Sequence, residues 1–244
     1  GGGSMGEKLV PRPVWSEQVV LPRLQGLHAT AVDTRRFRVC TATSMIFKNG
    51  KQMGGEVQVW SLRRGELQLT MPIQPGPDGK VHPPHTLIYA PELGCYLCVA
   101  GMNHLWACDL ATLLPAGYTV LNDRKVMACA FHHKRSEIVV ASADGTVRVL
   151  KVESKLVRDE VRVRRKPLCE FENVRTWREA NWCEHIALEE GLDVLFGVSE
   201  HVIYLWAFAS GAKLCSIEGA HKAKISCCAA FRVAGECRLA TGDQ

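Results

Sequence analysis

Residues 130–150 read Ala-Phe-His-His-Lys-Arg-Ser-Glu-Ile-Val-Val-Ala-Ser-Ala-Asp-Gly-Thr-Val-Arg-Val-Leu, and this stretch decides the fold. An apolar run, an Asp-Gly turn and a strand of alternating valines are typical of antiparallel β-strands joined by a tight turn. Three further segments, at 54–60, 102–108 and 200–206, share the turn and the strand that follows it. Recurrence at roughly 40 to 50 residues indicates a repeat architecture, here one of short β-strands.

The composition is that of a globular chain, with 244 residues, 47% hydrophobic and 23% charged. A net charge of +5 is too small to indicate a nucleic-acid partner. The eleven cysteines are an odd number, scattered through apolar runs, which favours a reducing, intracellular location. The cytoplasm is the predicted compartment, with the nucleus or a cilium left open. No apolar stretch has the length of a bilayer crossing, so no membrane span is expected.

The stretch at 130–150 resembles the WD40-repeat family, because it matches that family's apolar-Phe, Ala-Ser, Asp-Gly-Thr and alternating-valine blocks in order. Residues 206–221 resemble its inter-strand turn, outer strand and Gly-His junction. The resemblance covers residues 15–244, although the Trp-Asp pair that names the family is intact nowhere. It implies an all-β, WD40-like β-propeller of about four complete four-stranded blades plus a partial fifth.

The resemblance also implies boundaries within residues 28–244. The expected blades are residues 28–71, 85–121, 125–166, 183–218 and a partial unit at 222–244, after a linker at 1–4 and an N-terminal segment at 5–27. In this segment, residues 15–24 resemble a closing outer strand. The fifth unit has its first two strands, at 225–231 and 238–241, and the sequence stops where the third would begin. We therefore expect a part of a larger propeller, with an incomplete ring as the alternative.

The same frame predicts that residues 57–60, 104–108, 146–150 and 202–206 are third strands, each paired on both sides within its own sheet. Strand alternation then predicts buried side chains at Trp60 and Trp206 and exposed ones at Arg162 and Arg164.

Several polar residues occupy positions of the family's buried hydrogen-bond relay, which holds each blade together. Ser142 and Asp144 match two of its positions, and His221, Thr241 and Asp243 match three. Buried groups of this kind must pair, because an unsatisfied one costs about 1 to 3 kcal/mol. A Ser, His and Asp grouping also invites a hydrolase interpretation. At scaffold positions a structural role is favoured, so no enzyme activity and no cofactor are predicted.

The spacing of Cys95, Cys98, His104 and Cys108 is near that of a zinc knuckle. Residues three apart in a strand point to opposite faces, so Cys95 and Cys98 cannot share a metal ion unless the chain bends. Small core residues are therefore the favoured interpretation. Two histidine pairs are expected to be exposed loop residues: His82 with His85, and His132 with His133.

Two surfaces are candidates for binding. A basic stripe alternates with valines and is expected on one face of an outermost strand: Arg158, Arg162, Arg164, Arg165 and Lys166. Charge on an edge strand protects against aggregation, and a nucleic-acid or phosphoinositide site is the alternative.

The second candidate surface consists of four loops expected at one end of the blades: 48–55, 72–84, 122–125 and 167–181. The last loop carries Arg175, Trp177 and Arg178, residue types that are enriched at interface hot spots. We predict that these three residues bind a partner, the alternative being that Trp177 folds back to cover the blade edge. The predicted function is a non-catalytic scaffold that binds other proteins, within a larger intracellular protein.

Overall fold

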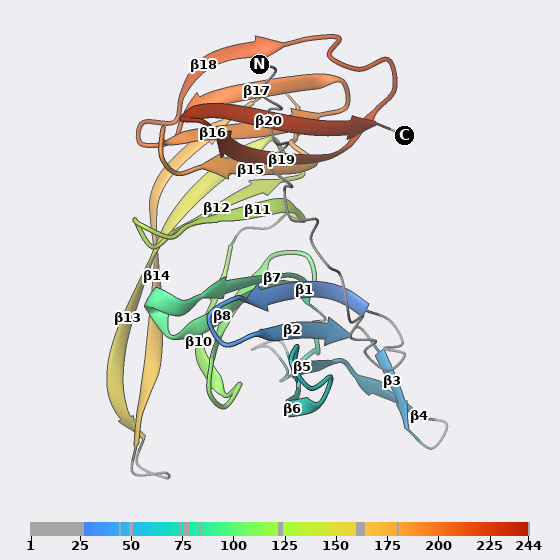
Figure 1. Ribbon diagram of the computed structural model, residues 1–244, viewed down its shortest axis with the longest axis vertical. Coiled ribbons are helices and arrows are strands. Elements are labelled where there is room, and N and C mark those ends of the chain that lie inside the picture. Colours follow the sequence, from blue (N-terminus) through green and yellow to red (C-terminus); the bar gives the residue numbers. More distant parts are fainter. Residues whose placement is uncertain are drawn as a thin grey trace, which may run out of the picture.

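The computed structural model describes residues 27–43, 45–48, 51–73, 75, 79–82, 84–121, 124–159, 164–179 and 181–243. In this part of the chain the elements are β-strands, apart from one 3-10 turn, η1 (Pro91–Leu93). The strands form four four-stranded antiparallel sheets and two two-stranded ones (Figure 1). None of the described residues forms a helix with the length and apolar character needed to cross a membrane.

The four larger sheets repeat one strand order. The first contains β1 (Leu27–Asp33), β2 (Arg38–Thr43), β5 (Glu56–Ser61) and β6 (Leu67–Pro72). The second contains β7 (Pro84–Ala90), β8 (Cys95–Ala100), β9 (His104–Asp109) and β10 (Pro115–Val120). The third contains β11 (Val126–His132), β12 (Glu137–Ser142), β13 (Thr146–Asp159) and β14 (Arg164–Arg178). The fourth contains β15 (His185–Glu189), β16 (Val194–Ser199), β17 (Val202–Ala207) and β18 (Ala212–Ile217).

The four predicted third strands are confirmed. Strands β5, β9, β13 and β17 each pair antiparallel with a neighbour on both sides. Trp60 and Trp206, which stand in β5 and β17, are buried as expected. Arg162 and the side chain of Arg164 lie outside the described part of the structure. The expected outer strand at 15–24 lies outside it as well.

The two remaining sheets are hairpins. Strands β19 (Ile225–Val233) and β20 (Glu236–Asp243) pair with each other at the two positions where the first strands of the fifth unit were predicted. Strands β3 (Met45–Lys48) and β4 (Lys51–Gly54) form a hairpin between β2 and β5. The prediction of a loop at 48–55 is therefore wrong, because most of that segment pairs as a strand.

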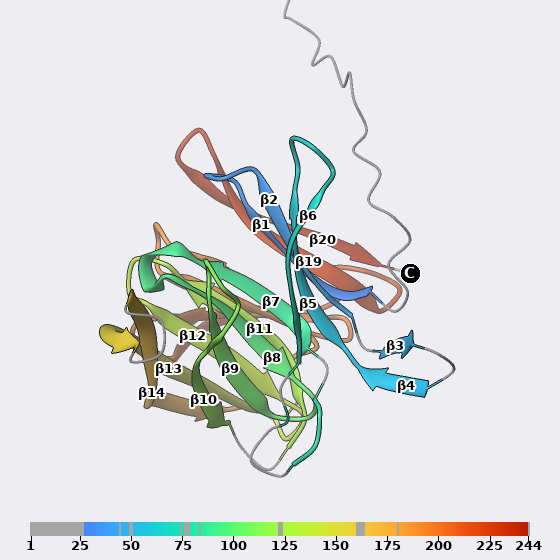
Figure 2. The ribbon, with the colours of Figure 1, turned by 90° about the horizontal axis from the view of Figure 1, so that it is seen from below.

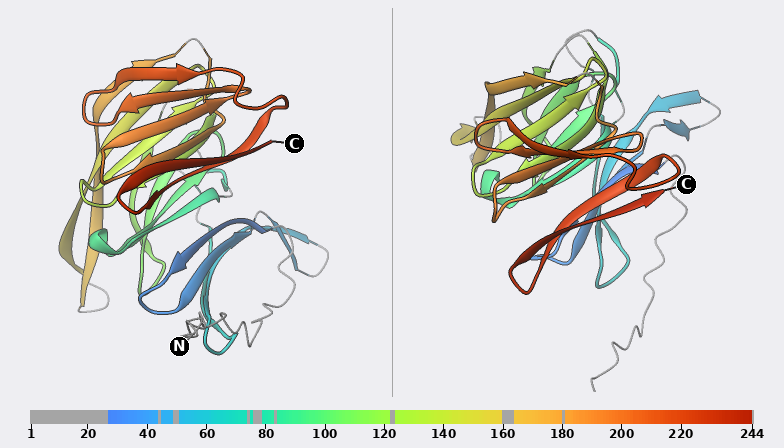
Figure 3. Two further views of the ribbon diagram at one scale, coloured as in Figure 1. Left: turned by 45° about the horizontal axis from the view of Figure 1, so that its top comes forward. Right: turned by 90° about the horizontal axis from the view of Figure 1, so that it is seen from above.

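Consecutive sheets pack face against face, and an apolar cluster fills each junction. Cys40, Val59 and Tyr96 lie between the first and second sheets, and Leu97 and Val140 lie in the cluster between the second and third. The sheets follow one another along a curve from β1 to β20 (Figures 2 and 3). The second, third and fourth sheets bury apolar side chains on both faces against their neighbours in the chain, which is typical of a repeat protein.

The outer part of the third sheet differs most from expectation. The fourth strand, β14, spans Arg164–Arg178, so the prediction of a loop at 167–181 is wrong and the sheet extends beyond residue 166. Pro167 lies within β14, opposite Leu156. An outermost strand tolerates proline, because one of its edges makes no ladder hydrogen bonds.

Strands β13 and β14 also project from their sheet as two long, twisted, paired strands, which we call the arm (residues 154–159 and 164–169; Figure 1). The basic stripe is therefore not one outer strand. Arg158 belongs to β13 and stands opposite Arg165 in β14. The base of the arm contacts β10 of the second sheet. Gly117 permits this approach, since a Cβ atom there would lie 2.4 Å from the carbonyl oxygen of Cys169.

Candidate interaction site

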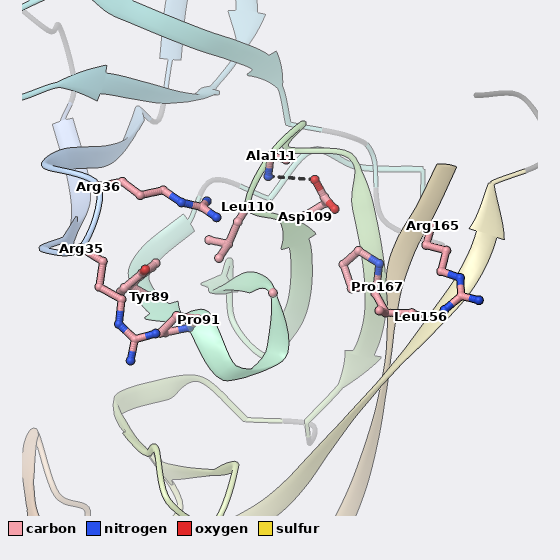
Figure 4. Close-up of a pocket in the computed structure, with 11 residues that line it drawn as sticks. Arg35, Arg36, Tyr89, Pro91, Asp109, Leu110, Ala111, Leu156, Arg165 and Pro167 are labelled. Atoms are coloured by element: carbon pink, nitrogen blue, oxygen red, sulfur yellow. Dashed lines mark hydrogen bonds between the residues drawn. The ribbon is translucent and has the colours of Figure 1, made fainter. Parts of the chain in front are cut away.

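A pocket of about 280 Å³ lies where the first, second and third sheets meet. Its lining comes from the β1–β2 turn, the ends of β7 and β9 with the η1 and β9–β10 turns that follow them, and the arm: Arg35, Arg36, Tyr89, Pro91, Gly94, Asp109, Leu110, Ala111, Leu156, Arg165 and Pro167 (Figure 4). These turns join first to second strands and third to fourth strands. The pocket therefore lies at the end of the sheets opposite to the loops that were predicted to bind a partner.

Three arginines line this pocket. Arg35 and Arg36 extend from the β1–β2 turn toward Pro91 and Leu110, and Arg165 stands across the pocket with its guanidinium group directed away from them (Figure 4). All three residues are exposed. Among the described residues, neither Arg35 nor Arg36 forms an ion pair with a carboxylate. The wall of the first sheet therefore presents two adjacent positive charges that no carboxylate of the described residues pairs with.

The turn that carries these arginines is held by the buried carboxylate of Asp33. Its Oδ1 accepts the main-chain N–H of Arg36 at 3.0 Å, and its Oδ2 accepts Nη2 of Arg38 at 3.0 Å. Burial alone would raise the pKa of Asp33, but these bonds and one from the Tyr89 hydroxyl hold the pKa below its ordinary value. Burial and the bond to Asp33 in turn raise the pKa of Tyr89. Both oxygens of the Asp33 carboxylate therefore accept hydrogen bonds from the turn and from Arg38.

Asp109, the one carboxylate in the pocket lining, also accepts hydrogen bonds within its own turn. Its Oδ1 accepts the main-chain N–H groups of Ala111 at 2.8 Å and Thr112 at 2.7 Å. Asp109 is buried, with 7% of the residue exposed. Asp109 therefore stabilises the β9–β10 turn, which places Leu110 at the pocket. Its negative charge is stabilised by two main-chain N–H groups.

The wall opposite the β1–β2 turn is the arm, which adds apolar surface and further positive charge. Leu156 is 66% exposed and stands beside Pro167 at the pocket. Beyond them, Arg158 and Arg165 are opposite each other in the ladder, and like charges in that position are unfavourable. The site thus combines an exposed aliphatic wall with arginines that form no ion pair in the part of the chain that the structure describes.

The predicted partner-binding residues Arg175, Trp177 and Arg178 lie in strand β14, not in a loop. Arg175 pairs with Glu137 and lies over the ring of Phe208. Trp177 packs on Trp206, with ring centroids 6.2 Å apart. Arg178 is exposed and donates from Nε to the carbonyl oxygen of Asp144. Two of the three side chains therefore make contacts between the third and fourth sheets, and the partner-binding role stays a prediction.

The predicted relay residues of the last hairpin are brought together. Nε2 of His221 lies 2.6 Å from Oγ1 of Thr241, and Nδ1 lies 3.1 Å from Oδ2 of Asp243. In the third sheet, Ser142 is buried, and Asp144 accepts the main-chain N–H of Thr146 at 3.0 Å. The first group ties the segment before β19 to β20, and the second closes the turn between β12 and β13.

The cysteines of the zinc-like pattern are divided between two cores. Cys95 faces the junction of the second and third sheets, where its Sγ lies 3.5 Å from Sγ of Cys169. Cys98 and Cys108 face the junction of the first and second sheets. His104 lies apart from them, stacked on His82. In the part of the chain that the structure describes, no group of three or more His, Cys, Asp or Glu is placed to hold a metal ion.

The expectation of an exposed His132 is wrong. This residue ends β11 with 2% of its side chain exposed, and its ring lies against Phe208, which follows β17 of the fourth sheet. Nε2 of His132 is 3.3 Å from Oδ1 of Asp193. Its neighbour His133 is exposed, as expected, and pairs with Glu92 of η1 at 2.9 Å. The two histidines therefore link the second, third and fourth sheets, because the packing order brings their turns together.

Comparison with known proteins adds no family assignment. No protein-family model matches the chain, and no curated protein matches it. The site is therefore interpreted from its own geometry.

Proposed function

We propose that the chain is a WD40-like β-propeller segment of a larger intracellular protein and acts as a non-catalytic scaffold that binds other proteins. The repeated strand order of the four sheets supports the propeller, as do the matching third strands that carry Trp60 and Trp206. The apolar clusters between sheets hold the turns at the sheet ends in place. Rigid scaffolds that position connecting segments commonly bind partners through those segments.

The observation that carries this proposal is the meeting of three sheets at one open pocket with mixed cationic and apolar walls. Arginine and tyrosine are enriched at interface hot spots, and the pocket combines Arg35 and Arg36 with Tyr89 and the exposed Leu156. Such a surface offers directed hydrogen bonds and buried apolar area to the same ligand.

Site-specific photo-crosslinking in cells that express the protein tests the proposal. A photoreactive residue replaces Leu156 at the pocket, and a matched control replaces Leu214 in β18, which is 56% exposed. We expect protein adducts at position 156 that a wild-type competitor suppresses, and few at position 214. Adducts with nucleic acid or lipid alone at position 156, or the same set of proteins at both positions, would contradict a protein scaffold working through this end.

The second candidate function is binding of nucleic acid or phosphoinositide by the basic stripe. The specific observation in its favour is the cross-strand pair of Arg158 and Arg165 on the exposed arm. Titration of a single-stranded oligonucleotide at increasing salt distinguishes it from protein binding, because phosphate contacts weaken steeply as salt rises.

A further inference from the structure

We propose that the pocket binds an acidic segment of a partner polypeptide, with a carboxylate or phosphate group between Arg35 and Arg36 and an apolar side chain against Leu156. This inference rests on the proposed scaffold function and names the chemistry of its partner.

The first argument is the unbalanced charge. Arg35 and Arg36 are adjacent, and neither forms an ion pair with a carboxylate among the described residues. The two nearby carboxylates have other partners, since Asp33 forms an ion pair with Arg38 and Asp109 accepts hydrogen bonds from the amides of its turn. Arginine presents its N–H groups in a planar fork that matches carboxylate and phosphate oxygens. An anion between these side chains would relieve their mutual repulsion.

The second argument is size. Small-molecule sites usually occupy about 300 to 1,000 Å³, so a volume of about 280 Å³ is at the low end of that range. It suits one or two side chains of a larger partner better than a whole nucleotide cofactor. The pocket is also bounded by the projecting arm, so a polypeptide seated in it can continue along β13 and β14.

The third argument is the nature of the walls. Leu110, Leu156, Pro91 and Pro167 provide aliphatic contacts beside the arginines. Tyr89 is the one aromatic residue in the lining. Single-stranded nucleic acids are bound through aromatic platforms on which successive bases stack. The walls therefore suit aliphatic side chains next to acidic ones, and a polypeptide provides both.

A synthetic library of random eight-residue peptides that includes Asp, Glu and phosphoserine tests the proposal with the full chain. We expect the retained peptides to be enriched in an acidic or phosphorylated residue beside an apolar one. In fluorescence anisotropy, Arg35→Glu with Arg36→Glu should weaken their binding by about tenfold or more. Leu156→Ala should weaken it by roughly threefold to tenfold.

The matched control is Lys222→Glu with Lys224→Glu, which makes the same change in net charge at two exposed residues in the segment before β19, outside the pocket and outside the predicted binding loops. Its effect on binding should stay below about threefold, since charge alone acts weakly across a Debye length. Circular dichroism and thermal melting verify folding of each variant. The neutral pair Arg35→Gln with Arg36→Gln replaces the reversal if the latter fails to fold.

Several outcomes would overturn the proposal. The library could enrich no acidic residue, or acidic peptides could bind the pocket variant and the control equally. Inorganic phosphate could bind as tightly as the best peptide, which would leave the apolar wall without a role. A single-stranded oligonucleotide, or vesicles with phosphatidylserine, could bind more tightly than any peptide and depend on Arg35 and Arg36. If protein adducts at position 156 survive Arg35→Glu with Arg36→Glu, the scaffold function stands and the acidic ligand does not.

Discussion

Two indole rings at the junction of the third and fourth sheets should differ in what they contribute to stability. Trp206 is fully buried, and its Nε1–H donates to Oε1 of Glu179 at 3.0 Å. Trp177 lies against it, but its own buried Nε1–H has no hydrogen-bond partner among the described residues. Replacement by phenylalanine removes an N–H in both cases, yet only in Trp206 does it remove a hydrogen bond.

The expected magnitudes follow from this difference. A hydrogen bond to a charged acceptor contributes about 1.5 to 3 kcal/mol. Trp206→Phe also leaves space in a fully buried site, so its total cost should be about 3 kcal/mol. Trp177 is half-buried and loses no hydrogen bond, so Trp177→Phe should cost about 1 kcal/mol or less. The gap of about 2 kcal/mol corresponds to a difference in Tm of about 4 to 8 °C for a chain of this size.

Urea denaturation followed by far-ultraviolet circular dichroism measures the gap without relying on tryptophan fluorescence. Trp182→Phe is the matched control, because Trp182 is 46% exposed and should lose little stability. Equal losses for Trp177→Phe and Trp206→Phe, or a larger loss for Trp177→Phe, would show that the bond to Glu179 does not hold this junction together.

Three further predictions concern other parts of the molecule. At pH 8 the exposed Cys227 should react with a thiol reagent in the native protein, whereas Cys183 should react only after unfolding, because burial raises its pKa to about 12. The pKa of Asp33 is lowered in the folded state, so its stabilising effect is present at neutral pH and is lost as the pH falls below about 4. Asp33→Asn should therefore destabilise the protein by about 1.5 to 3 kcal/mol at pH 7, the range for hydrogen bonds to a charged group, with the deficit shrinking in acid titrations of the urea midpoint. Trp177→Ala with Arg178→Ala should lower the Tm; an unchanged Tm with a partner affinity weakened by about 2 kcal/mol would instead support the predicted partner-binding role of this pair.

The third strands could be predicted from sequence because their signal is local. A tight turn followed by alternating apolar residues, as at Asp144 to Leu150, specifies both the strand and the face it buries. The arm could not be predicted in this way. Alternation of valines and arginines is the same whether a strand ends its sheet or continues into a hairpin, and the length of β13 is set by its pairing with β14. Pro167 also suggests a break, which an outermost strand tolerates.

The pocket could not be predicted from the sequence, although two of its lining residues form a recognisable pattern. Arg35 and Arg36 are adjacent cations in a hairpin turn, and this pattern is readable in the sequence. Their joining with Tyr89 and Leu156 depends on how three sheets pack, which no local pattern specifies. His132 could not be predicted to be buried for the same reason, since its ring packs against Phe208, which follows β17 of the next sheet.

Amide hydrogen exchange, resolved by residue, tests most directly whether the sequence repeat and the sheet repeat coincide. Strands paired on both sides should exchange more slowly than outer strands, because opening them breaks two ladders. The amides of β5, β9, β13 between Thr146 and Leu150, and β17 should therefore be among the slowest in the chain, and those of β6 and β18 clearly faster. Exchange at any two of these four third strands as fast as in the turns would contradict the repeat.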